Sequence, residues 1–281
     1  MQRQLSEILG KDILAIDFFT KGQIGDVYRV QTIDKSYILK TSNPSNRLQI
    51  EADMLKDINK YKITVPQVYA STETLLLMEY IEELGIGKEA EELEAAKVLT
   101  DLHAVSNESR MYGYYYDTTI ASFEQKNEQT QYNWGLFLGQ MRILPMVQIC
   151  YDKGQISLET VGRLEGLCRD LYKRIDMSKI TPSLLHGDLW NGNILFNMNT
   201  AVLIDPAIYF EDREMELAFI LMFNTFGETF FRTYREVHPL SEDFYETKVP
   251  LYQIYPLLVH VALYGSVYSK QLEQVLKRLK V

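Results

Sequence analysis

The segment from residue 184 to residue 205 constrains this chain more than any other part of its sequence. Its first twelve residues read Leu-Leu-His-Gly-Asp-Leu-Trp-Asn-Gly-Asn-Ile-Leu. Four residues separate Asp188 from Asn193, and Asp205 follows Asn193 by twelve. A carboxylate can accept a hydroxyl proton, whereas an amide and a second carboxylate supply oxygen ligands of the kind that Mg²⁺ prefers. The three side chains therefore combine a candidate proton acceptor with two candidate metal ligands.

The spacing from Asp188 to Asn193 is also that of the protein-kinase catalytic loop, which a metal-binding aspartate follows later in the chain. Residues 194–196 and 201–204 read as two short apolar strands around a Met-Asn turn. Such a hairpin would return Asp205 beside Asn193. Each residue alone has an ordinary interpretation, because His-Gly-Asp is a common turn and an aspartate after a strand often caps the next element. Their agreement in spacing and context favours a site for phosphoryl transfer to a small molecule.

Composition restricts the class of protein and of partner. The chain has 281 residues, of which 46% are hydrophobic and 24% charged, as is usual for a globular protein. A formal charge of −9 argues against a nucleic-acid or membrane partner but is compatible with an amine-bearing substrate. The N-terminus lacks an apolar signal core and the apolar runs are too short to span a bilayer, so we expect a cytoplasmic protein.

Residues 1–81 have the pattern of a small strand-rich lobe. Near its middle, apolar residues fall on one face of an expected helix, at Leu48, Ala52, Leu55 and Ile58. The expected elements are a helix at 2–10, strands at 13–19, 26–32 and 36–41, a helix at 47–59, and strands at 67–70 and 75–80.

From residue 82 onward the pattern is mainly helical. Residues 107–131 are the exception, because they are polar and rich in tyrosine, and we expect a long loop of the kind that often forms a functional lid. The expected helical segments are 89–105, 132–151, 158–175, 215–223, 228–236 and 248–281, the last in one or more pieces.

Several residues of the first lobe are candidates for binding a nucleotide. Gly22 and Gly25 lie between the first two strands, where they form either a plain hairpin or a loop whose N–H groups approach phosphates. Lys40 ends the third strand, and Glu51 lies beside the apolar face of the following helix. Such a pair positions the α- and β-phosphates in kinases. The alternatives are a lysine that reaches solvent and a surface glutamate, with Asp53 as the nearest other partner for Lys40.

The last strand of this lobe runs into a candidate hinge. It reads Leu-Leu-Leu-Met at 75–78 and continues as Glu79, Tyr80 and Ile81. We expect the backbone of Met78, Glu79, Tyr80 and Ile81 to offer donors and acceptors to adenine, which would place the nucleotide at the junction of the lobes.

Together these features resemble the fructosamine kinase (ketosamine 3-kinase) family, which shares the protein-kinase-like fold of aminoglycoside and choline phosphotransferases. The motif His-Gly-Asp-Leu-Trp-x-Gly-Asn at 186–193 is closely associated with this family, and Trp190 separates it from most other small-molecule kinases. The resemblance covers nearly the whole chain. Further similar segments lie at 112–120, 134–144, 205–207, 214–218 and 251–255.

The resemblance implies an α+β, protein-kinase-like, two-lobed fold. Residues 1–81 would form an antiparallel β-sheet lobe that binds ATP, and residues 82–281 a mainly helical lobe that carries the catalytic loop, the metal and the acceptor. By the resemblance, Asp188 is the base for the 3-hydroxyl of a ketosamine, and Asn193 with Asp205 holds Mg²⁺. Lys40 with Glu51 would anchor ATP. The acceptor would be a ketosamine, small or protein-bound, so that the reaction serves protein deglycation.

The acceptor side is less determined. Trp190 fits either a platform for the sugar or a core aromatic that steadies the loop. His186 is expected to order the loop, since Asp188 already holds the position of the base, and both His186 and Glu214 are kept as candidates for contact with the acceptor.

Departures from the family pattern leave the natural sugar open. The chain has Lys21-Gly22 where paired glycines are frequent, and it differs at 224–226 and 259–262, on the acceptor side. Two alternatives remain: a kinase for an aminoglycoside, choline or methylthioribose-like metabolite, or a nucleotide-binding protein without turnover. The oligomeric state is also open.

Overall fold

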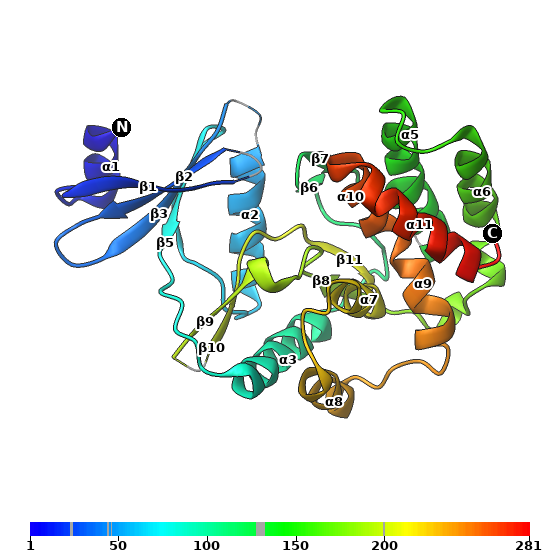
Figure 1. Ribbon diagram of the computed structural model, residues 1–281. Coiled ribbons are helices and arrows are strands. Elements are labelled where there is room, and N and C mark those ends of the chain that lie inside the picture. Colours follow the sequence, from blue (N-terminus) through cyan, green and yellow to red (C-terminus); the bar gives the residue numbers. More distant parts are fainter. Residues whose placement is uncertain (23–24, 44, 46, 128–132, 199) are drawn as a thin grey trace.

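The structure, a computed structural model, describes residues 1–22, 25–43, 45, 47–127, 133–198 and 200–281 (Figure 1). The first strands form a single five-stranded sheet in the order β1-β2-β3-β5-β4, with every neighbouring pair antiparallel. This confirms the antiparallel sheet expected from the sequence. The strands are β1 Ala15–Lys21, β2 Asp26–Gln31, β3 Ser36–Thr41, β4 Val68–Ser71 and β5 Leu75–Glu79.

Alternating side chains give this sheet two different faces. In β3, Tyr37 and Leu39 pack with Leu5 of helix α1 (Gln2–Leu9), while Lys40 lines a cavity on the opposite side. Helix α2 (Arg47–Lys60) lies on this second side, and its four predicted apolar positions are all buried. The sheet therefore joins an outer core under α1 to a larger core that continues into the rest of the chain.

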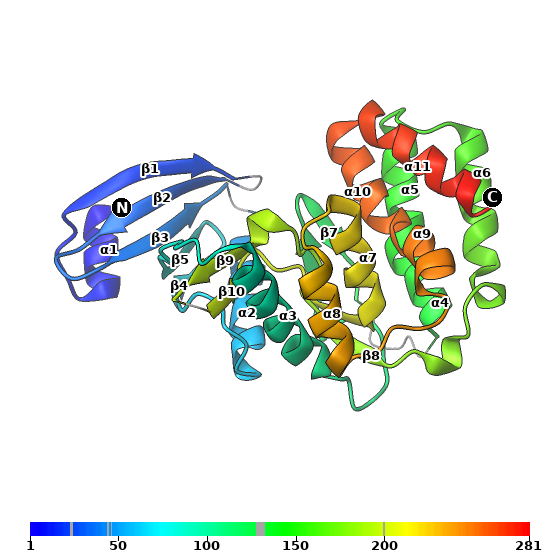
Figure 2. The same ribbon diagram turned by 60° about the horizontal axis from the view of Figure 1, so that its bottom comes forward.

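The remainder of the chain is mainly helical and forms a second lobe (Figure 2). Figure 2 shows α3 and α8 side by side, and α5, α6, α10 and α11 grouped at the far end from the sheet. The longer helices are α3 Lys88–Ala104, α5 Leu144–Asp152, α6 Leu158–Arg169, α7 Arg213–Phe223, α8 Glu228–Val237, α10 Ile254–Tyr264 and α11 Ser266–Arg278. No described helix combines the length and the apolar composition needed to cross a membrane.

Residues 80–87 connect the two lobes between β5 and α3. The Leu84 N–H donates to the Phe196 carbonyl at 2.8 Å, and Asn197 Nδ2 donates to the Glu82 carbonyl at 2.6 Å. These bonds hold the connection against β9 (Ile194–Asn197), the strand that follows the motif at 186–193. We propose the boundary of the lobes after Ile81, within this connection.

The segment expected to be one long loop is more structured than its composition suggests. It contains a short hairpin of β6 (Thr118–Ile120) and β7 (Phe123–Gln125), and Gly113 pairs with Phe210. The expectation of one long loop was therefore wrong for the residues of this hairpin. Of the tyrosines in the segment, Tyr112 and Tyr114 are buried and Tyr116 is partly buried in the core. Residues 128–131 of the expected loop lie outside the described residues.

Three predicted helices differ in extent or continuity. The one expected at 132–151 is described from residue 133 and is divided into α4 (Trp134–Leu136), a π-helical turn Phe137–Ile143 and α5, while the one expected at 158–175 ends at Arg169. The last expected helix divides into α9 (Val249–Tyr252), α10 and α11. Gly265, with φ 74°, separates α10 from α11, a conformation that an L side chain strains to adopt.

Candidate functional site

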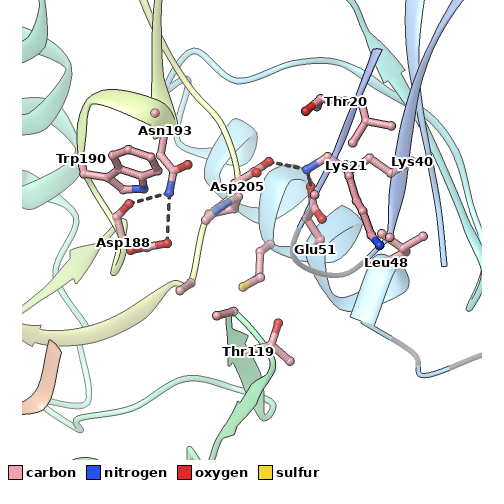
Figure 3. Close-up of a pocket in the computed structure, with 18 of the residues that line it drawn as sticks. Thr20, Lys21, Lys40, Leu48, Glu51, Thr119, Asp188, Trp190, Asn193 and Asp205 are labelled. Carbon is pink, nitrogen blue, oxygen red and sulfur yellow. Dashed lines mark hydrogen bonds and ion pairs between the residues drawn. The ribbon is translucent and has the colours of Figure 1, made fainter. Parts of the chain in front are cut away.

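One strand and the hairpin that follows it bring the residues of the opening motif to one place. The catalytic loop lies between β8 (Pro182–Leu185) and β9 (Ile194–Asn197), and β9 pairs with β10 (Thr200–Leu203) as the sequence predicted. The Ile204 N–H donates to the Asn193 carbonyl at 3.0 Å. Asp205 therefore lies close to Asn193, and both line a cavity of about 510 Å³ together with Asp188 (Figure 3). This volume is in the usual range for a small-molecule site.

Asn193 closes the loop onto Asp188. Its Nδ2 donates to the Asp188 carbonyl at 2.7 Å and to Asp188 Oδ2 at 3.1 Å, as Figure 3 shows. Because the amide nitrogen is used in this way, Asn193 Oδ1 is turned away from Asp188. The amide thus fixes the carboxylate and keeps an oxygen ligand for a cation.

The environment of Asp188 opposes its negative charge. Burial, followed by the charge of Asp205, raises the pKa of Asp188 to about 8, although the Asn193 hydrogen bond lowers it. A carboxyl group with a pKa in this range is a stronger base than an ordinary aspartate. The protonated form of Asp188 predominates near neutral pH, and the ionised form in equilibrium with it is the proton acceptor.

His186 lies behind the loop and not at the cavity. Its buried ring accepts a hydrogen bond from the Asp188 N–H at Nδ1, at 3.3 Å, when the proton is placed on Nε2, which then donates to the Ile204 carbonyl at 2.9 Å. Burial lowers the pKa of His186, which favours this neutral form. The ring thus joins the loop to the residue before Asp205, and His186 does not itself line the cavity as a residue in contact with the acceptor would.

Glycine at position 187 is required by a close approach of the backbone. Gly187 has φ 85°, and a Cβ there would lie 2.2 Å from the Ala207 carbonyl oxygen. The Ala207 N–H in turn donates to the His186 carbonyl at 2.8 Å. The catalytic loop is therefore packed directly against the segment that follows Asp205.

Glu216, on α7, holds the loop from behind and had no role in the sequence interpretation. Its Oε1 accepts from the Gly187 N–H at 2.7 Å, and its Oε2 from the His186 N–H at 3.0 Å. His103 Nε2 lies 3.0 Å from the same Oε2. Burial opposes the charged form, but these hydrogen bonds hold the pKa of Glu216 below its usual value. The available signal was a carboxylate placed directly before the apolar run that begins at Leu217.

Lys40 faces the catalytic loop from the sheet. Its Nζ lies 2.7 Å from Glu51 Oε1 and forms a second ion pair with Asp205 (Figure 3). Burial alone would lower the pKa of Lys40, but the Asp205 and Glu51 carboxylates raise it above its usual value. Asp53, the alternative partner, instead pairs with Lys56 at the surface. The Lys40 ammonium group therefore links the two lobes at the cavity.

The other candidates for the nucleotide side divide into two groups. Gly22 and Gly25 line the cavity, and the Gly22 N–H donates to the Gly25 carbonyl at 2.8 Å, so that they close a hairpin that is also part of the cavity wall. Among the described residues, the lining includes none of the four hinge candidates, Met78, Glu79, Tyr80 and Ile81.

Glu79 is already engaged within the sheet. Its N–H donates to the Gln67 carbonyl at 2.8 Å, and its carboxylate accepts from the Gln67 N–H at 3.2 Å. Tyr80 carries the Arg29 guanidinium over its ring at 4.5 Å. The Glu79 N–H is therefore not available to adenine, because it belongs to the strand pairing.

Trp190 lies at the cavity with 43% of its surface exposed. Its indole ring covers Gly192, where a Cβ would come within 2.5 Å of ring carbons. An aromatic face is thus available beside Asp188, supported by a residue that has no side chain. Of the two interpretations left open by the sequence, this exposure favours a platform over a core aromatic.

Glu214 does not reach the site, which corrects its candidacy as an acceptor ligand. It is 2% exposed and its Oε2 lies 2.6 Å from Lys248 Nζ, while Ser241 donates to both carboxylate oxygens. Its charge is already paired in a buried network, so it is not available to a ligand.

The far wall of the cavity was missed by the sequence interpretation. Thr119 and Ala121 come from the β6–β7 hairpin, and Pro206 and Ala207 follow the metal-ligand candidate Asp205. Only the expectation of a lid at 107–131 pointed to the first pair. A threonine in a short strand and an alanine in the following turn form no local sequence pattern that indicates binding.

Comparison with known proteins agrees with this geometry. The sequence model of the fructosamine kinase family, described as "Fructosamine kinase", matches residues 1–281. A protein of Enterococcus faecium named probable ketoamine kinase is 29% identical over 263 residues, covering 91% of this chain and 92% of its own.

Solved structures are similar over the same length. A protein of Thermobifida fusca, provisionally named a fructosamine-3-kinase, has a TM-score of 0.90 and 28% identity, with 100% of this chain and 99% of that one covered. The aminoglycoside phosphotransferase APH(4)-Ia, solved with ADP and hygromycin B, has a TM-score of 0.72 at 11% identity, covering 99% and 98%. At that identity the second likeness concerns the fold alone: two lobes of the kinase-like type.

Proposed function

The chain belongs to the fructosamine kinase family and is a phosphotransferase, and from this premise we propose that it transfers the γ-phosphate of ATP to the 3-hydroxyl of a ketosamine. The observation that carries the proposal is the meeting of Asp188, Asn193, Asp205 and Lys40 around one cavity. Lys40 and its partner Glu51 come from the sheet lobe, and the others from the helical lobe. A nucleotide bound between the lobes would contact both.

Asp188 has the role of base in this proposal. It accepts the proton of the acceptor hydroxyl, whose oxygen forms a bond to the γ-phosphorus as the bond from that phosphorus to the bridging oxygen breaks and ADP leaves. The raised pKa of Asp188 suits this step, and the hydrogen bond from Asn193 Nδ2 at 3.1 Å orients the carboxylate. The proton then passes to solvent.

The remaining polar groups hold and neutralise the phosphates. Lys40, oriented by Glu51, contacts the α- and β-phosphates. Asn193 Oδ1 and the Asp205 carboxylate, 46% exposed, are oxygen ligands of the type that suits Mg²⁺, which when bound neutralises charge between the β- and γ-phosphates. Gly22 and Gly25 border the same end of the cavity, while the backbone of Met78, Tyr80 and Ile81 remains our candidate for adenine.

The acceptor enters beside Trp190, in the cavity that Thr119 and Ala121 also line. An indole face suits the C–H face of a sugar, which supports a ketose-derived acceptor. We propose that the amine of this ketosamine is small or belongs to a protein, so that phosphorylation at O3 leads to deglycation in the cytoplasm.

A turnover assay tests the proposal. Purified protein with ATP and Mg²⁺ is offered fructosamine, ribulosamine and erythrulosamine, and ADP release is measured together with the site of phosphorylation by NMR. We expect turnover on at least one ketosamine with phosphate on O3. Aminoglycosides and choline serve as matched comparison acceptors.

Two outcomes would overturn the proposal. Turnover confined to aminoglycosides or choline would assign the site to another acceptor class. Nucleotide binding without ADP release on any acceptor would leave a nucleotide-binding protein without turnover.

A further inference from the structure

Helix α2, which carries Glu51, is hydrogen-bonded to the other lobe at both of its ends. At the first residue of the helix, Arg47 Nη2 donates to the Ser122 carbonyl at 2.7 Å. Near the last turn, Asp57 Oδ2 accepts from the Tyr114 hydroxyl at 3.0 Å and from the Tyr116 hydroxyl at 2.8 Å. Glu51 lies between these two attachments. All three partners belong to residues 112–127, which we call the clamp segment.

The clamp segment is itself fixed to the helical lobe. Gly113 exchanges two backbone hydrogen bonds with Phe210, at 3.0 and 2.7 Å. At its other end, Gln125 Nε2 donates to the Tyr255 hydroxyl at 3.0 Å, and the fully buried Arg142 donates to Asn127 Oδ1. The clamp segment is therefore bonded both to the helical lobe and to α2, and it connects the two.

The hydroxyl groups that meet Asp57 are suited to donate. Burial, together with the Asp57 carboxylate, raises the pKa of Tyr114 and of Tyr116 above the ordinary value, so both phenols keep their protons. Asp57 also pairs with Lys60 at 2.5 Å and is itself largely buried. A carboxylate that accepts two phenol hydrogen bonds forms a stronger attachment than neutral groups would.

We propose that the clamp segment holds α2 in the orientation in which Glu51 reaches Lys40, and that Asp57 is therefore a positioning residue for nucleotide binding. Asp57 acts through Glu51 and does not touch the ligand. Thr119 and Ala121 of the same segment line the cavity, so one continuous piece of chain forms part of the cavity wall and holds the helix that carries Glu51. This inference rests on the proposed function only in assigning the nucleotide to Lys40.

The test removes the two hydroxyls and keeps the rings. Tyr114→Phe/Tyr116→Phe preserves the stacking of residue 114 on Phe210, whose ring centroids are 5.8 Å apart. Calorimetry with the non-hydrolysable analogue AMP-PNP and Mg²⁺ measures affinity. If the loss of the attachment lowers the population of the competent orientation of α2, the apparent Kd rises about 3- to 10-fold. Tyr115→Phe, between the two tyrosines and 56% exposed, is the matched control and leaves Kd unchanged.

A double-mutant cycle separates positioning from general stabilisation. In a Glu51→Gln background the Lys40–Glu51 ion pair is already broken, so the double phenylalanine variant should add less than about a 2-fold change in Kd if it acts through Glu51. An undiminished effect in that background, or an unchanged Kd in the double variant alone, overturns the clamp.

Failure of the proposed function would look different. If the unmodified protein binds no nucleotide, the kinase proposal fails, and the clamp is then judged by amide hydrogen exchange. The amides of α2 should exchange faster in Tyr114→Phe/Tyr116→Phe than in Tyr115→Phe, with equal global unfolding midpoints. Equal exchange of α2 in the two variants overturns the clamp independently of any ligand.

Discussion

Three features of the folded structure act on the ionisation and orientation of the Asp188 carboxyl group, and the spacing of the motif alone does not provide them. Burial and the Asp205 charge oppose its ionisation, and the Asn193 amide orients it. Asn193 also bonds the Asp188 backbone carbonyl at 2.7 Å, an attachment that does not involve the carboxylate. A change of the side chain at 188 therefore leaves the loop tied together.

We expect Asp188→Asn to lower kcat by about 10² to 10⁴, because an amide cannot accept the hydroxyl proton, while nucleotide affinity stays near that of the unmodified protein. Steady-state kinetics on the preferred ketosamine and calorimetry with AMP-PNP measure the two quantities. Asp170→Asn, a surface substitution with a half-exposed side chain, is the control. Turnover equal to that of the unmodified protein would remove Asp188 as the base.

Glu211 shows a second effect of burial on a carboxyl group, away from the cavity. It is fully buried in β11 (Tyr209–Asp212), and burial raises its pKa to about 8. Its Oε1 accepts from the Asp212 N–H at 3.1 Å, and burial outweighs the effect of this bond and of the neighbouring Trp134, both of which lower the pKa. The folded protein therefore favours the protonated form.

This difference predicts the pH dependence of stability. The pKa of Glu211 is higher in the folded than in the unfolded chain, so its contribution to the free energy of unfolding is fully present below the unfolded pKa near 4.5 and is lost as pH rises through about 8. Between pH 5 and pH 8, Glu211→Gln should weaken the fall in stability that the parent shows in urea unfolding. Glu228→Gln, exposed on α8, should keep the parent slope; an identical slope in Glu211→Gln would contradict the assignment.

At the level of elements, the catalytic loop depends on a helix that does not line the cavity. The loop joins β8 to the β9–β10 hairpin, and two of its N–H groups bond Glu216 on α7 at 2.7 and 3.0 Å. His103 on α3 bonds the same carboxylate and lies 2.7 Å from the Tyr234 hydroxyl on α8. Three helices therefore set the position of the loop through one side chain.

We expect Glu216→Gln to lower kcat about 10- to 10²-fold with little change in the KM for ATP, because a shift of the loop misplaces Asp188 while Lys40 and Glu51 keep their pairing. Steady-state kinetics at saturating acceptor measure both parameters. Glu228→Gln again serves as the control. A rise in the KM for ATP without loss of kcat would show that Glu216 acts on the sheet lobe instead.

At the level of the whole molecule, the proposed nucleotide site uses groups from both lobes. Lys40 of the sheet contacts Asp205 of the helical lobe, and the connection at 80–87 is bonded to β9. A ligand that contacts both sides binds the folded protein and not the unfolded chain. Its binding should therefore appear as added stability.

We expect AMP-PNP with Mg²⁺, at about 100 times its Kd, to add about 2.7 kcal/mol of stability and to raise the unfolding midpoint by roughly 5 to 10 °C. Lys40→Met should lose most of this shift, since the phosphates lose their cation. Differential scanning calorimetry measures the midpoints. Lys97→Met, on the exposed side of α3, should keep the full shift, and an equal shift in Lys40→Met would contradict the role of Lys40.

Much of this architecture follows from local pattern. Strand alternation in the first lobe and the 3.6-residue periodicity of α2 are short-range properties, and they predicted the sheet and the apolar face of the helix. The spacing of Asp188 and Asn193, with the hairpin before Asp205, is short-range as well, so the motif could be identified without knowledge of the rest of the chain.

The tertiary structure decided which side chains from distant parts of the sequence contact one another. Glu216 reaches the loop from α7, Glu214 turns into a buried ion pair two residues earlier, and the tyrosines of the expected lid bond Asp57 across the lobes. No local spacing specifies these contacts, because they depend on how separate helices and hairpins pack. The sequence by itself determined which chemistry the catalytic loop can perform. Packing decided which residues form the cavity wall, which groups hold the loop and how α2 is attached. The reason is that burial and charge pairing arise only between segments that the fold brings together.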